Sequence, residues 1–128
     1  MINRLRMVQL RFKSEGRYIT IIKHGKLARS DIEALIKEAQ KRNSIVDLSG
    51  RDLSGLDLSK LSLGRANVSN VNFSDANLSN ATLFNANLLN SNLSHANLSY
   101  ADFSYVNLSK TKIAGTSLIN TVLFKAIM

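Results

Sequence analysis

The side chains that could do chemistry are few, and they do not form a catalytic motif. The only histidines are His24 and His95, and His95 lies twenty residues after Asp75 among many serines. A Ser-His-Asp set could be assembled on paper, but a chain this rich in serine supplies such sets by chance. Acyl transfer also needs an oxyanion site and a sheltered pocket. No H-E-x-x-H, phosphate-binding or dinucleotide-binding motif occurs. We therefore expect no enzymatic activity and no catalytic residue.

The absence of cysteine narrows the chemistry further. Without cysteine there are no disulfides, no thiolate catalysis and no cysteine-based zinc site. Any metal site would need other ligands, and we expect no metal and no cofactor. Six Asn-x-Ser sequences begin at Asn67, Asn72, Asn77, Asn92, Asn97 and Asn107. They are the by-product of a repeat, and we expect the Asn and Asp side chains to bond the backbone at tight turns.

A period of five residues organises most of the chain. Large apolar residues recur at every fifth position: Leu48, Leu53, Leu58, Leu63, Val68, Phe73, Leu78, Leu83, Leu88, Leu93, Leu98, Phe103, Leu108, Ile113, Leu118 and Leu123. Two residues before each of them stands a residue that is small or apolar in nearly every repeat. Asp or Asn lies between these two columns in most repeats, and serine usually follows the large residue.

A period of five fits neither a helix nor a flat strand, so the chain must turn at every step. If each repeat forms one side of a coil, the large and the small apolar residues point inward and the other three positions face water. Four sides give a coil of twenty residues, in which each large residue stacks over the one twenty positions away. Arg51 occupies a small inward position, which predicts either that the first coil is distorted there or that the N-terminal segment reaches into it.

The motif in Ala76-Asn77-Leu78-Ser79-Asn80 and Ala96-Asn97-Leu98-Ser99-Tyr100 resembles the pentapeptide-repeat family, A-(D/N)-L-x-x in tandem. The resemblance implies an all-β solenoid, a right-handed quadrilateral β-helix of about four coils. It divides the chain into a basic N-terminal segment (1–45), the repeats (46–125) and a short tail (126–128). Some members of the family mimic DNA and modulate type II topoisomerases. That mimicry needs an acidic rod, whereas these repeats carry six basic and five acidic residues.

The N-terminal segment reads as a ββα or helical cap. Val8, Leu10 and Phe12 alternate with polar residues, and the hairpin then turns at 13–16 and returns over 17–22. Ser30-Asp31-Ile32-Glu33 reads as a capping box that begins a helix ending at about Arg42. The apolar stripe of this helix is formed by Ile32, Leu35, Ile36 and Ala39. Because the end of a solenoid exposes its core, we expect the helix to cover the first coil.

The net charge of +8 is concentrated in the N-terminal segment, where eleven basic and four acidic residues give +7. A patch of this kind could bind nucleic acid, but without a base-reading motif or a stacking platform we expect weak, salt-sensitive binding at most. No signal peptide and no membrane-spanning stretch is recognised. We expect a soluble bacterial protein in the cytoplasm that does not bind membranes.

The remaining candidates for function are exposed apolar residues. Phe84, Tyr105 and Phe124 become neighbours in the coil, with Leu89 around the corner, and they form the best candidate interaction patch. At the C-terminal end, an open coil would expose Leu108, Ile113, Leu118 and Leu123. We expect a two-fold homodimer through this coil, with Leu118, Ile119, Leu123 and Phe124 at its interface. The sequence thus favours a non-enzymatic interaction or scaffold protein whose partner it does not name.

Overall fold

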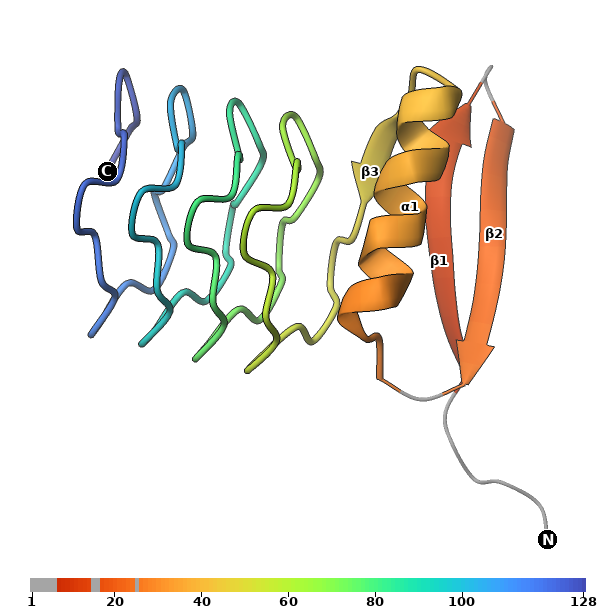
Figure 1. The fold of residues 1–128 in the computed structure, drawn as a ribbon, viewed down its shortest axis with the longest axis horizontal. Helices are drawn as coiled ribbons and strands as arrows, with labels where there is room; N and C mark the ends of the chain where they lie inside the picture. Colours follow the sequence, from red (N-terminus) through yellow and green to blue (C-terminus); the bar gives the residue numbers. More distant parts are fainter. Residues whose placement is uncertain (1–6, 15–16, 25) are drawn as a thin grey trace, which may run out of the picture.

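The computed structural model describes residues 7–14, 17–24 and 26–128, with side chains from Lys26 onward. Its elements in chain order are β1 (Met7–Ser14), β2 (Arg17–His24), α1 (Arg29–Lys41) and β3 (Ile45–Asp47). Beyond β3 the chain winds into successive coils that lead away from α1, and the C-terminus lies at the opposite end of the molecule (Figure 1).

The coils are held together by parallel pairing between residues twenty positions apart. Single bridges of this spacing run from Asp47–Asn67 to Asn107–Ile127, which is the register that the period of five predicts. We number the twenty-residue spans coil 1 (46–65), coil 2 (66–85), coil 3 (86–105) and coil 4 (106–125). On each side of the solenoid, backbone hydrogen bonds of 2.6–3.1 Å join one coil to the next.

Each repeat turns the chain through one corner. In the first repeat the backbone N–H of Arg51 donates to the carbonyl of Leu48, and Gly50 between them has a φ of +76°. A positive φ at this position is the signature of a type II turn. The side chain of Asp47 accepts a hydrogen bond of 3.0 Å from the N–H of Ser49, and Asn or Asp makes the same bond in most later repeats. The predicted structural role of the Asn and Asp column is confirmed.

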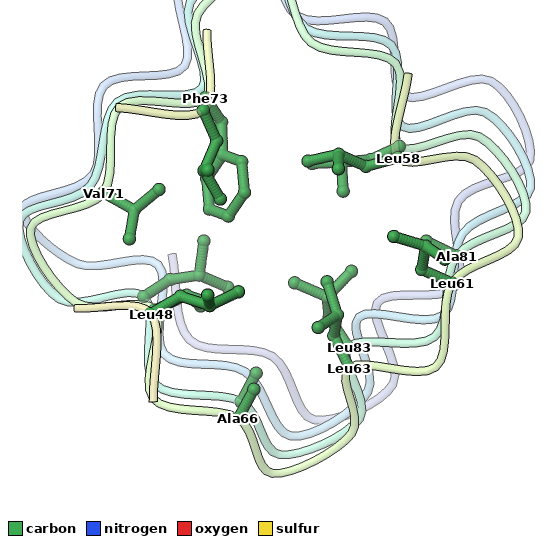
Figure 2. Close-up of a cluster of buried hydrophobic side chains, with 14 of the residues drawn as sticks. Leu48, Leu58, Leu61, Leu63, Ala66, Val71, Phe73, Ala81 and Leu83 are labelled. Carbon is green, nitrogen blue, oxygen red and sulfur yellow. The ribbon is translucent and has the colours of Figure 1, made fainter. Parts of the chain in front are cut away.

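The core runs along the inside of the coils. The large residues of coils 1 to 3 and Leu108 are buried, as are most of the small residues two positions before them. In Figure 2 the side chains of Leu48, Leu58 and Phe73 reach toward the centre from different sides, and Ala66 and Val71 fill the space nearer to the backbone. The predicted inward columns are therefore the observed ones.

Arg51 does not distort coil 1, so that alternative is wrong. Its N–H makes the regular turn bond to Leu48, and its carbonyl accepts a ladder bond of 3.0 Å from Asn72. Its Nε atom is nevertheless buried without an acceptor, as is the hydroxyl of Ser91 in the same column of the solenoid.

The N-terminal hairpin exists as predicted and also joins the solenoid. β1 and β2 pair antiparallel from Met7–His24 to Ser14–Arg17, while the turn residues Glu15 and Gly16 lie outside the described residues. β1 also pairs antiparallel with β3, giving the sheet order β2-β1-β3. Because Val46 of β3 also accepts a ladder bond from Asn67, the hairpin continues the hydrogen bonding of coil 1 on one side.

Helix α1 begins earlier than predicted. Ala28 is its N-cap, and its backbone N–H donates to the side chain of Asp31 over 2.7 Å. The capping box expected at Ser30 is therefore wrong: the chain turns two residues earlier, where Asp31 at the third helical position can accept this bond. The predicted stripe of Ile32, Leu35, Ile36 and Ala39 is buried in one cluster with the apolar residues of coil 1. In the described part of the chain, no helix has the length and hydropathy that crossing a membrane requires.

At the other end, the expectation that Leu108 is exposed is wrong. Leu108 is 5% exposed because its N–H donates to the carbonyl of Ile127, and Asn107 pairs with Ile127 across the same gap. Residues 126–128 therefore follow the path of the repeats over Leu108. Ile113 and Leu118 are exposed at the end of coil 4, and Leu123 is partly buried.

Candidate interaction surface

Three aromatic side chains stand on one side of the solenoid, where most other outward residues are polar. The rings of Phe84 and Tyr105 lie 5.4 Å apart, and those of Tyr105 and Phe124 lie 5.6 Å apart, both in edge-to-face contact. We call these three residues the aromatic ladder. Its exposed fractions rise toward the C-terminal end, from 37% for Phe84 through 44% for Tyr105 to 59% for Phe124.

The twenty-residue register explains how the aromatic ladder forms. Phe84 and Phe124 occupy the same outward position in coils 2 and 4, and Ser104 stands between them in coil 3. Tyr105 follows Ser104 at a left-handed corner, with a φ of +61°, and its ring contacts both phenylalanines. Ser104 itself is 6% exposed. Edge-to-face contacts of this kind stabilise the arrangement of the rings.

Lys125 also belongs to this surface, although sequence reasoning did not include it. Its Nζ atom lies 5.9 Å from the centre of the Tyr105 ring and 5.6 Å from that of Phe124, within reach of cation–π attraction. Lys125 lies twenty residues after Tyr105 and directly follows Phe124, so the register of the coils brings its backbone to this surface. Leu89 is exposed as expected, but it lies in the next repeat around the corner from Phe84.

The residues expected at a dimer interface lie at the end of coil 4. Leu118 and Ile119 are exposed, Leu123 is partly buried, and Phe124 is shared with the aromatic ladder. The apolar end of the solenoid and its aromatic side therefore meet at Phe124. The structure contains one copy of the chain, so the homodimer stays a prediction.

His95 packs against the next coil of the solenoid. Within the described residues, no hydrogen bond joins its side chain to that of Asp75, and the His95 ring instead lies against Gly115 in the next coil. A Cβ atom at residue 115 would be 2.4 Å from the ring Nδ1 atom of His95. The glycine is required both by this close approach and by its φ of +70°. His95 is therefore packed on the backbone of coil 4.

The junction of α1 with coil 1 contains a groove of about 470 Å³. Ile36 and Lys37 line it from the helix, and Lys60 and Leu61 line it from the coil. No sequence pattern pointed to this groove. Its lining is mixed, with Ala34 beside the charged Glu33 and two serines, Ser30 and Ser62.

Comparisons with known proteins place the repeats in one family. The family model for pentapeptide repeats matches in eight copies, over residues 46–80, 62–99, 76–113 and 101–128. No curated protein sequence matches the chain. Among solved structures, HetL, a pentapeptide-repeat protein involved in heterocyst differentiation regulation from the cyanobacterium Nostoc sp. strain PCC 7120, is 36% identical with a TM-score of 0.62.

A second similar structure is a pentapeptide-repeat protein from the thylakoid lumen of Arabidopsis thaliana, 34% identical with a TM-score of 0.52. The HetL match covers 65% of this chain and 38% of HetL, and the Arabidopsis match covers 62% of this chain and 59% of that protein. The chain thus spans less than two thirds of either relative. Because the family model matches from residue 46 to residue 128, this chain belongs to the pentapeptide-repeat family.

Proposed function

We propose that this chain is a non-enzymatic protein-interaction module whose aromatic ladder is the contact surface for a partner protein. The proposal includes a solenoid of four coils that α1 and β1 cap at the N-terminal end. In its support, residues twenty positions apart pair throughout the repeats, and the helix shares one buried cluster with coil 1.

The observation that carries the proposal is the exposure of three aromatic rings in mutual contact. Exposed apolar clusters mark interaction sites, and aromatic residues are enriched at the centres of protein interfaces. Two features lower the cost of binding here. The rings are held by edge-to-face contacts, and the backbone beneath them is fixed by ladder bonds such as that from Tyr105 N–H to Phe124 C=O.

The test uses affinity capture from the native cell with identification by mass spectrometry. Wild-type chain is compared with Phe84→Ser and Tyr105→Ser, which remove rings from the aromatic ladder. Tyr100→Ser is the matched control, because Tyr100 is also an exposed tyrosine at a left-handed corner but stands outside the aromatic ladder. Thermal unfolding of each variant shows whether the solenoid is intact.

We expect at least one partner that is captured by the wild type and by Tyr100→Ser and is lost with both ladder variants. If folded ladder variants keep every partner, or if Tyr100→Ser loses the same ones, the aromatic ladder is not the contact surface.

A further inference from the structure

The aromatic ladder faces sideways, across the stacked coils. Phe84 belongs to coil 2 and Tyr105 to coil 3, and each of these coils lies between two others to which its backbone is bonded (Figure 1). The exposed fractions of 37% for Phe84 and 44% for Tyr105 therefore do not depend on where the coils begin or end. A ligand that covers these rings must lie along the side of the solenoid.

Large and small side chains alternate in the outward column that carries the two phenylalanines. From coil 1 to coil 4 this column reads Gly64, Phe84, Ser104 and Phe124, so a ring recurs at every second coil. Neighbouring coils are spaced like paired strands, and two coils therefore span about 9.6 Å. A polyproline II helix has three residues per turn, and its side chains that face the same way recur at about 9.3 Å. In an extended strand they recur at about 6.8 Å, which does not match.

The corner column beside the rings supplies hydrogen-bond donors. It consists of Arg65, Asn85, Tyr105 and Lys125, one residue from each coil. Each of these side chains can donate a hydrogen bond, and none is a carboxylate. The Arg65 and Asn85 side chains are exposed, and no described residue pairs with either of them.

These free donors favour a ligand whose backbone carbonyls are unpaired. A polyproline II chain has no internal hydrogen bonds, so its carbonyls can accept from Asn85 and from the Tyr105 hydroxyl. An α-helix uses most of its carbonyls internally and would leave the donors unsatisfied. The unpaired guanidinium of Arg65 adds a positive charge at one end of the surface, which favours a carboxylate on the ligand.

We propose that the aromatic ladder binds a proline-rich segment of a partner protein, in the polyproline II conformation and flanked by carboxylates. Prolines three positions apart pack against Phe84 and Phe124, the carbonyls between them accept from Asn85 and Tyr105, and a flanking carboxylate pairs with Arg65. Grooves lined by aromatic rings suit such segments, because the polyproline II chain is ordered before it binds. This inference rests on the proposed interaction function and names the chemistry of the partner.

The probes are three fluorescently labelled peptides with the same flanking glutamates. One has a run of prolines between the glutamates, the second has glycine in place of every proline, and the third is an amphipathic helix with a leucine face. Fluorescence anisotropy measures their binding to the intact chain. A single-stranded DNA oligomer is titrated in the same way, because exposed aromatic rings can also stack on bases.

Two variants locate the binding, each with a matched control. Tyr105→Ser removes the central ring, and Tyr100→Ser removes an exposed corner tyrosine outside the aromatic ladder. Arg65→Glu reverses the charge beside the ladder, and Lys60→Glu makes the same charge change at another exposed corner of coil 1. Thermal unfolding shows that each variant is folded.

We expect the proline peptide to bind the wild type and both controls equally. Its affinity should fall at least about tenfold in Tyr105→Ser and at least about fivefold in Arg65→Glu. The glycine peptide should bind the wild type about tenfold more weakly than the proline peptide, since it must be ordered on binding.

The proposal is overturned if the proline peptide does not bind, if the glycine or the helical peptide binds as tightly, or if either variant leaves the affinity unchanged. DNA that binds more tightly than the proline peptide and is lost in Tyr105→Ser would make a nucleic acid the occupant, which also overturns it. If a partner captured from the cell depends on the aromatic ladder but no proline peptide binds, the interaction function holds and this inference is wrong.

Discussion

At the scale of single residues, the repeat depends on one backbone conformation at every fifth position. From Gly50 to Lys125, each of these corner residues has a positive φ. Glycine, asparagine and aspartate tolerate this conformation best, whereas a residue such as Tyr105 adopts it at a cost of roughly 1–2 kcal/mol. The corner N–H is bonded to the next coil in most repeats, so cooperative ladder bonds offset the strain. The large apolar residue of each repeat also stabilises the turn, because its side chain is buried in the core of most coils.

The first prediction compares an inward with an outward residue of one repeat. Leu78 is fully buried, and Ser79 beside it is only partly buried and faces outward. Leu78→Ala leaves a cavity among stacked side chains and should lower the free energy of unfolding by about 2–4 kcal/mol more than Ser79→Ala does. Denaturant unfolding measures both variants. Equal midpoints would mean that the inward columns are misassigned.

The second prediction separates two requirements for glycine. Gly115→Ala adds a Cβ atom at a residue of positive φ and places it against the ring of His95. Gly50→Ala also adds a Cβ atom at a residue of positive φ, but there no atom lies within 4 Å of it. We expect Gly115→Ala to be the more destabilising, with Gly50→Ala costing about 1 kcal/mol. His95→Ala should recover the difference when it is combined with Gly115→Ala. If His95→Ala leaves the cost of Gly115→Ala unchanged, the ring does not pack on residue 115.

At the scale of elements, the two ends of the solenoid are built from different residues. In the Asn and Asp column, coil 1 carries Asp47, Asp52 and Asp57, whereas coil 4 has Asn107 and Lys112. The aspartates of coil 1 lie close to the cap: Lys26 is 3.9 Å from Asp52, and Arg29 is 3.6 Å from Asp57. The small inward residues also change in coil 4, where Thr111, Thr116 and Thr121 donate hydrogen bonds to carbonyls of coil 3.

Asp57 should make the stability of coil 1 sensitive to pH. Hydrogen bonds from the side chain and the N–H of Ser59 lower its pKa below the ordinary value, and the charge of Arg29 lowers it further. A lowered pKa in the folded state contributes stability above the unfolded pKa of about 4, and this stability is lost as the pH falls through the folded pKa. We therefore expect Asp57→Asn to lose less stability than the wild type between about pH 5 and pH 3. Thermal unfolding across this range measures it. Parallel pH profiles would contradict the prediction.

The cap as a whole should be needed for solubility. Deleting residues 1–45 exposes the apolar core of coil 1 and removes the donors of Lys26 and Arg29, so the truncated chain should aggregate or associate. Soluble yield and light scattering of the truncated and intact chains measure the effect. The prediction fails if the truncated chain is monomeric, equally soluble and equally stable to heat.

The sequence predicted the features that repeat and missed those that depend on one side chain or one long-range pair. The inward columns, the hairpin and the apolar stripe of α1 all follow from periodicity. The pairing of β1 with β3 did not follow from periodicity, because three residues are too few to show the alternating pattern of a strand. The helix start was misplaced because Asp31, rather than Ser30, makes the capping bond. The sequence correctly predicted that the three aromatic side chains are neighbours, because the twenty-residue register relates the positions of Phe84, Tyr105 and Phe124. The position of Lys125 over the rings was not foreseen, since it depends on the rotamer of one flexible side chain.

At the scale of the whole molecule, the solenoid is polar along its axis. Lys26 and Arg29 donate hydrogen bonds to carbonyls of coil 1, and coil 4 carries lysines and exposed apolar residues. The aromatic ladder runs along one side of the solenoid from Phe84 in coil 2 to Phe124 in coil 4. A partner that binds at Phe124 can therefore contact both the aromatic ladder and the exposed apolar residues of coil 4.

The central claim is that the chain forms stacked coils joined by backbone hydrogen bonds between residues about twenty positions apart. Residue-resolved amide hydrogen exchange tests this most directly. The N–H groups of Phe73, Asp75, Leu93 and His95 donate across coils and should exchange slowly. The equivalent N–H groups of Ile113 and Gly115 should exchange faster by on the order of a hundredfold or more, since no described residue accepts a hydrogen bond from them. Fast exchange at Phe73 and Leu93 would contradict the hydrogen-bond ladder between coils. If Ile113 and Gly115 were as well protected as Phe73 and Leu93, the protection could not be due to the ladder.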